Sequence, residues 1–102
     1  EARRAETRYR ATVLKAFVEV ADGLEAVSAS ESELRLRQTA LATAEENLRL
    51  ARRAYDLGSL RLPDVLDAQR QANGARQAFA RVQGQRLLAY ADLFAASATV
   101  IG

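Results

Sequence analysis

Residues 55–70 read YDLGSLRLPDVLDAQR, and this stretch decides how the rest of the chain is arranged. It contains the only proline of the sequence, Pro63, and one of its five glycines, Gly58. Glycine readily takes the left-handed conformation that commonly ends a helix, and proline suits the first turn of the next helix. The stretch therefore predicts a turn between two helices, with residues 57–62 at its tip.

The segment before this turn has the periodicity of a long helix. From residue 2 to residue 56 there is no proline, and the one glycine is Gly23. Such a spacing predicts a single helix over about residues 2–56, packed in the manner of a coiled coil. The first interface row recurs every seven residues and consists of Val13, Val20, Val27, Leu34, Leu41, Leu48 and Tyr55. A companion row four residues further on is expected to be Phe17, Leu24, Glu31, Gln38, Glu45 and Arg52.

The segment after the turn predicts a second helix over about residues 63–98, with residues 99–102 as a fraying end. Its interface positions are mostly alanine, so a partner backbone can approach closely. The fold class is therefore all-α, a long antiparallel helical hairpin. Because the first helix is longer, its first dozen residues are expected to overhang, which indicates a piece of a larger protein. The interface row of the second helix is Val65, Ala68, Ala72, Ala75, Phe79, Val82, Arg86, Ala89, Leu93, Ala96 and Val100.

The composition excludes several kinds of function. Cysteine and histidine are both absent, which removes thiolate nucleophiles, disulfides, imidazole bases and the usual zinc ligands. The 15 basic residues are interspersed with 13 acidic ones, so the charge pattern argues against nucleic-acid binding. No apolar run approaches the ~20 residues of a membrane-spanning helix. We expect no cofactor and no metal.

The strongest catalytic candidates are the carboxylates of Asp64 and Asp67, which lie three residues apart at the start of the second helix. Acid–base catalysis by paired carboxylates needs an enclosed pocket, which a thin hairpin does not offer. Negative charge near the first turn of a helix also has an ordinary structural reason, because it complements the helix dipole. We interpret both residues as helix-start acids and predict that the chain is not an enzyme.

The turn and its flanks resemble a known family. The pattern Tyr55-x-x-Gly58 followed by DVLDAQ at residues 64–69 is similar to the second periplasmic hairpin of TolC-like outer-membrane efflux proteins. The run TVLKAFVEVAD at residues 12–22 resembles part of that family's long helix, and residues 87–102 resemble the segment that leads to its glycine-rich end. The resemblance covers essentially the whole chain.

This resemblance implies a role in export from Gram-negative bacteria. Members of the family are homotrimers with a β-barrel in the outer membrane and an α-helical barrel in the periplasm. The resemblance implies that this chain is much of one periplasmic hairpin, with the signal peptide, the β-barrel strands and the first hairpin outside the sequence. The duct does no chemistry, and its energy comes from an inner-membrane transporter coupled through a periplasmic adaptor protein.

The resemblance also assigns roles at the tip. Leu57, Gly58, Ser59 and Leu60 correspond to the turn on which the adaptor docks. The candidate aperture gate consists of Tyr55, Arg61, Asp64 and Asp67. Arg61 lies one place from the position expected for the gate arginine, and Pro63 replaces the usual apolar residue before Asp64.

Three alternatives remain open at the level of sequence. A periplasmic adaptor also contains a long helical hairpin, and a free-standing coiled-coil scaffold needs only heptads. A signal peptide and a β-barrel in the parent reading frame would separate the channel from both. An enzyme using Asp64 and Asp67 would lose turnover when either is replaced. In every case the isolated chain is expected to self-associate, because its apolar rows lack neighbours.

Overall fold

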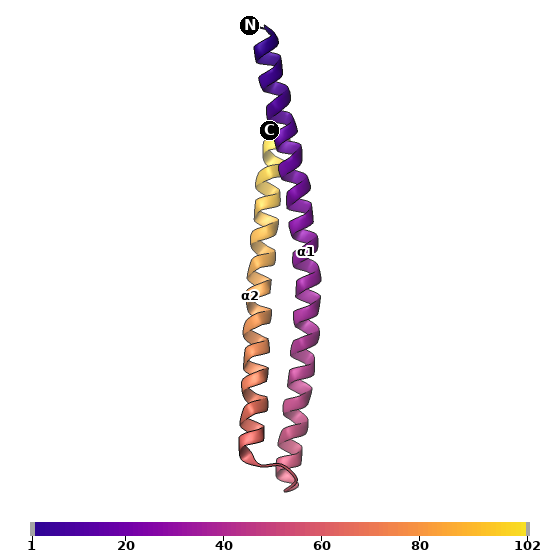
Figure 1. Ribbon diagram of the computed structural model, residues 1–102, viewed down its shortest axis with the longest axis vertical. Coiled ribbons are helices and arrows are strands. Elements are labelled where there is room, and N and C mark those ends of the chain that lie inside the picture. Colours follow the sequence, from indigo (N-terminus) through magenta and orange to yellow (C-terminus); the bar gives the residue numbers. More distant parts are fainter. Residues whose placement is uncertain (1, 102) are drawn as a thin grey trace. The chain divides into compact units, whose positions relative to one another are not determined.

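The computed structural model describes residues 2–101, and over that range the fold is an all-α helical hairpin, as the sequence predicts. Helix α1 comprises Ala2–Asp56 and helix α2 comprises Leu62–Ile101, with residues 57–61 between them (Figure 1). Helix α2 ends three residues later than the sequence pattern predicted. Near that end the Thr99 hydroxyl donates to the Ala95 carbonyl at 3.2 Å, so the hydroxyl bonds within the helix.

The contacts divide the hairpin into two compact units, and each contains a segment of both helices. The tip unit comprises residues 32–84, which include the turn. The end unit combines α1 up to Glu31 with α2 from Gln85 onward. Within each unit the two helix segments lie side by side and run in opposite directions (Figure 1).

Both units have a thin core built largely from small side chains. In the tip unit the buried apolar residues are Leu48, Ala72 and Val82, and in the end unit they are Ala16 and Ala89. The first predicted row of α1 faces inward from Val13 to Leu48, and its last member, Tyr55, is exposed. The predicted row of α2 faces inward until Val100, which is exposed. Alanine at these positions lets the two backbones approach closely.

The apolar members of the predicted companion row of α1 are wrong by one residue. Phe17 and Leu24 are exposed over more than half of their surface, whereas Ala16 is buried and Gly23 is half-buried. The second inward row of α1 therefore lies three residues after the first, and its members are mostly small. The physical reason is the alanine-lined surface of α2, because a bulky side chain there would hold the two helices apart. This inward row is Ala16, Gly23, Ser30, Ala44 and Ala51, and it is interrupted by Arg37, which is exposed.

One glycine marks a close approach of the two helices in the end unit. A Cβ atom added to Gly23 would lie 3.1 Å from Cδ1 of Leu93 and 3.4 Å from its Cα. Such contacts are tighter than ordinary van der Waals packing, so even an alanine there requires Leu93 to move. The glycine that interrupts α1 is thus explained by packing against α2.

The turn after α1 is closed by a Schellman motif. Gly58 has φ of 80°, the left-handed conformation that the sequence predicts for it. The amide of Ser59 donates to the carbonyl of Ala54 at 2.8 Å, and the amide of Gly58 donates to the carbonyl of Tyr55 at 3.0 Å. These two bonds are the 6→1 and 5→2 pair of the motif, and they satisfy carbonyls that would otherwise lack partners at the helix end.

The start of α2 follows the expected chemistry. The amides of Asp64 and Val65 both donate to the carbonyl of Arg61, which makes Arg61 the capping residue. Pro63 lies in the first turn, where its missing amide hydrogen costs nothing. Asp64 places a carboxylate in that turn, in line with the helix dipole. The turn is therefore fixed on both sides by backbone hydrogen bonds.

Candidate docking site at the helical turn

The four predicted docking residues form the exposed end of the tip unit. The Leu57 side chain is 71% exposed, although it is fully apolar. Gly58 and Ser59 are also exposed, and Leu60 is half-buried. A Cβ atom added to Gly58 would meet nothing within 4 Å, so solvent surrounds this backbone. The local sequence thus holds a large apolar side chain in water on a turn of fixed geometry.

The side chains of the four candidate gate residues do not bond to one another. Tyr55, Arg61 and Asp64 are exposed, and Asp67 accepts a hydrogen bond from Nε2 of Gln71 at 3.3 Å. Within residues 2–101, no side-chain hydrogen bond or ion pair joins any two of the four, and the one bond among them is the backbone bond from the Asp64 amide to the Arg61 carbonyl. Their grouping near one end of the tip unit comes from the turn alone, and their gate role stays a prediction.

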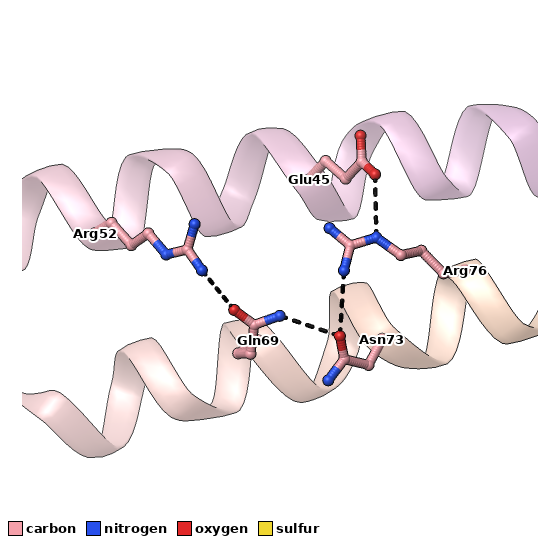
Figure 2. Close-up of polar contacts among 5 residues, drawn as sticks. All are labelled: Glu45, Arg52, Gln69, Asn73 and Arg76. Carbon is pink, nitrogen blue, oxygen red and sulfur yellow. Dashed lines mark hydrogen bonds and ion pairs between the residues drawn. The ribbon is translucent and has the colours of Figure 1, made fainter.

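A polar network links the two helices close to the turn (Figure 2). Arg52 donates from Nη2 to Oε1 of Gln69 at 2.6 Å, and Nε2 of Gln69 donates to Oδ1 of Asn73 at 3.1 Å. The guanidinium of Arg76 donates to the same Asn73 oxygen at 3.3 Å and pairs with Glu45 at 3.4 Å. Two residues on α1 and three on α2 are thereby joined into one chain of bonds.

Sequence reasoning missed this network, although a signal was present. Glu45 and Arg52 are seven residues apart on α1, and Gln69 and Arg76 are seven residues apart on α2. Because the helices are antiparallel and the spacing is equal, Arg52 can face Gln69 while Glu45 faces Arg76. Glu45 and Arg52, two polar members of the predicted companion row, thus flank the core and bond across it. Arg52, which was predicted as the last member of the companion row, reaches Gln69 on the other helix.

A shallow groove of about 460 Å³ opens beside the network. Leu48 is the one leucine that lines the groove, and its side chain is buried. The charged lining residues come mainly from α1. Next to the groove, the hydrogen bond from Arg49 to Glu46 holds the pKa of the Glu46 carboxyl below its usual value. Among the described residues the groove is lined by Glu45, Leu48, Arg49, Arg52, Arg53, Asp56 and Arg76.

The end unit has its own polar contact between the helices. Arg86 donates from Nε to Oε1 of Glu31 at 2.5 Å, and the Tyr90 hydroxyl donates to the same oxygen at 2.9 Å. The Arg86 guanidinium also lies 5.4 Å from the centre of the Tyr90 ring, within the range of a cation–π contact. The hydrogen bond to Glu31 raises the pKa of Arg86 above its ordinary value. A partly buried charge pair at an interface row favours one register of the helices over its neighbours.

Large apolar side chains are exposed on the sides of the end unit. Phe94 is 73% exposed, and several leucines of both helices are more than half exposed. Within residues 2–101, neither helix has a stretch apolar enough to cross a membrane. Contiguous exposed apolar groups on a folded surface usually mark contacts with other chains. The exposed large apolar side chains of this unit are Tyr9, Leu14, Phe17, Val18, Leu24, Leu87, Leu88, Phe94, Val100 and Ile101.

The side chains near the turn form surfaces on which another protein can bind. Asp64 is exposed, and the Asp67 carboxylate bonds to Gln71 one turn later. Within residues 2–101, no group of three acidic, histidine or cysteine side chains is placed to hold a metal ion. What the described part of the chain presents is an apolar turn, a charged groove beside it, and apolar sides.

Taken together, these features define a helical hairpin whose turn and sides are available to other protein surfaces. The chain belongs to the outer membrane efflux protein family, whose sequence model matches residues 1–99. This match confirms the family that the residues around the turn resemble.

Three relatives illustrate the similarity. The chain is 38% identical over 80 residues to nodulation protein T of Rhizobium leguminosarum bv. viciae. These aligned residues make up 78% of the chain and 17% of the relative. The chain is 33% identical over 89 residues to the probable efflux pump outer membrane protein TtgC of Pseudomonas putida KT2440. The antibiotic efflux pump outer membrane protein ArpC of Pseudomonas putida has the same identity, and both matches cover 87% of the chain and 18% of the relative. The chain thus spans less than a fifth of the length of each. No solved structure gives a significant match.

Proposed function

We propose that the chain forms part of an outer-membrane efflux channel, in the periplasmic exit duct of a tripartite export system. In this role the turn at Leu57, Gly58, Ser59 and Leu60 docks a periplasmic adaptor protein, which couples the duct to an inner-membrane transporter. The chain would carry no catalytic residue and no cofactor. Membership of the outer membrane efflux protein family supports the channel over the hairpin of an adaptor and over a free-standing scaffold.

One observation carries the docking role: the 71% exposure of Leu57 on a turn held by backbone hydrogen bonds. An apolar side chain of this size gains free energy when a partner removes it from water. The Schellman motif already fixes the backbone, so little conformational entropy is lost when the partner binds. A rigid turn with an exposed leucine is thus well suited to be the contact point of a second protein.

The apolar sides of the end unit fit the assembly proposed for the full-length protein. In a homotrimeric α-helical barrel, each hairpin has neighbours on both sides, and side chains such as Phe17 and Phe94 would be covered by them. Tyr55, Arg61, Asp64 and Asp67 lie close enough to the turn to contribute to a gate formed when copies meet. No bond joins their side chains within one chain, which is compatible with side-chain partners on other copies.

A transport assay tests the channel role. Deleting the gene for the full-length protein is expected to raise the accumulation of at least one compound in a panel of antibiotics and fluorescent dyes. A plasmid copy of the gene should restore the normal level, since the defect would lie in the exit duct. Unchanged accumulation across the panel, in a strain whose other efflux channels have been deleted, would contradict the proposal.

The isolated chain is expected to self-associate as its concentration rises. The reason is that its exposed apolar side chains lack the neighbours they would have in the full assembly. Sedimentation equilibrium should show a species larger than 11.1 kDa. A double variant, Phe17→Ser with Phe94→Ser, should shift the equilibrium toward the monomer, because both residues are exposed and outside the core. A clean monomer of the unmodified chain at high concentration would contradict the expectation.

A further inference from the structure

The groove beside the turn contains more positive charge than its own partners neutralise. Four of its seven lining residues are arginines, and two are acids. Arg76 pairs with Glu45 inside the groove, and Arg49 pairs with Glu46 next to it. The two remaining arginines are Arg52 and Arg53.

Neither of these two arginines is paired with a carboxylate. Arg52 donates to Gln69, whose amide oxygen is neutral, so its positive charge remains uncompensated. The Arg53 side chain has no hydrogen bond or ion pair within the described part of the chain. Asp56 lines the same groove, but among residues 2–101 its carboxylate lies within 4 Å of no cationic group. Two guanidinium groups therefore face an open groove with most of their donors free.

The groove is prepared for a ligand by the network in Figure 2. Gln69 holds the Arg52 guanidinium, Asn73 holds Gln69, and Arg76 holds Asn73. Fixing a long side chain in advance lowers the entropy lost when a partner binds it. Leu48 also lines the groove but is only 4% exposed, so charged side chains dominate the surface that a ligand would meet.

The chemistry of these groups selects a carboxylate. A guanidinium presents parallel N–H donors that match the two oxygens of a carboxylate, and such charge-assisted pairs are stronger than neutral hydrogen bonds. A nucleic acid is a poor fit, because Glu45 and Asp56 would repel its phosphates and no aromatic ring lines the groove for stacking. An acidic protein side chain is small enough to reach the arginines between those acids.

We propose that this groove receives a glutamate or aspartate from a helix of the docked adaptor, with Arg52 and Arg53 as the recognition residues. The inference rests on the proposed docking role, and it extends that surface from the turn along α1. Arg53 lies in the last turn of α1, next to the loop that begins at Leu57. A helix that covers the turn and continues alongside the hairpin would therefore pass over the groove.

The test measures the affinity of the purified adaptor for the full-length protein in detergent, at low and at high salt. Arg53→Glu is expected to weaken binding about tenfold at low salt, and the effect should shrink at high salt. Arg53→Lys keeps the charge and should lose less. The matched control is Arg70→Glu, since Arg70 is also an exposed and unpaired arginine of the tip unit but does not line the groove.

Every outcome decides the inference. Equal loss of affinity in Arg53→Glu and Arg70→Glu would overturn it, because only net charge would matter. If Gly58→Val prevents adaptor binding while Arg53→Glu leaves it unchanged, the groove is not used although the turn docks the adaptor. If Arg53→Glu weakens only self-association of the chain, the occupant is a second copy. If the unmodified protein binds no adaptor, both the inference and the docking role fail.

Discussion

Replacing Gly58 with valine is expected to weaken adaptor binding at least tenfold while leaving the helices intact. Gly58 has φ of 80°, a conformation that a β-branched residue adopts at a cost of about 1–3 kcal/mol. The added side chain would meet no neighbouring atom, so the cost lies in the backbone itself. The turn should relieve the strain by giving up its Schellman bonds, which would move Leu57 from its place.

Two control variants separate the backbone effect from other consequences. Asparagine tolerates the left-handed region, so Gly58→Asn should keep most of the adaptor affinity. Gly74→Ala changes a helical glycine of the same unit that also has open space around it. It should stabilise the chain by up to about 1 kcal/mol and leave docking unchanged.

The measurements are adaptor affinity, efflux in cells, and helicity by far-UV circular dichroism. Gly58→Val should lower the first two without changing the third. Normal efflux in cells that produce Gly58→Val at the usual level would contradict the docking role of the turn. Equal defects in the valine and asparagine variants would contradict the backbone explanation, because the added side-chain bulk would then be the cause.

The turn was predictable from sequence because its signals are local. Gly58 needs no tertiary contact to favour the left-handed region, and Pro63 restricts its own φ wherever it stands. The inward row from Val13 to Leu48 was equally clear, since apolar residues that repeat every seven positions lie on one side of a helix and face its partner. The family pattern around Asp64 to Gln69 depends on the same short stretch.

The second row of α1 could not be settled from α1 alone. Phe17 and Ala16 are both apolar neighbours, and hydrophobicity favours the larger one as the core residue. The choice depends on how closely α2 approaches, which Ala72, Ala89 and the contact between Gly23 and Leu93 determine. The decisive information thus lies in the residues of the partner helix and in the register of the two helices.

The arginine groove was hidden for a related reason. Glu45, Arg52, Gln69 and Arg76 read as polar positions on two separate helices, and polar positions usually face solvent. Only the antiparallel register brings the two rows together. Arg49 and Arg76 each pair with a glutamate, so Arg52 and Arg53 are the arginines of the groove whose charge has no carboxylate partner.

Replacing Leu48 with alanine is expected to lower the free energy of unfolding by about 2–3 kcal/mol. Leu48 is 4% exposed and is the bulkiest of the buried core residues in the described part of the chain. Most of the other buried core residues are alanines, which cannot extend into the space that its removal leaves. The rest of the core is thin, so this one contact carries a large share of the packing in the tip unit. Urea unfolding at a fixed protein concentration measures the loss.

Leu50→Ala is the matched control, because Leu50 lies two residues away on the same helix and is 49% exposed. Both substitutions remove the same atoms and change helix propensity by the same amount, so their difference isolates the packing term. Leu50→Ala should alter stability by no more than about 0.5 kcal/mol. Equal effects of the two variants would contradict the inward row that includes Leu48. A large effect confined to Leu48→Ala would instead tie the stability of the tip unit to the single leucine that lines the groove.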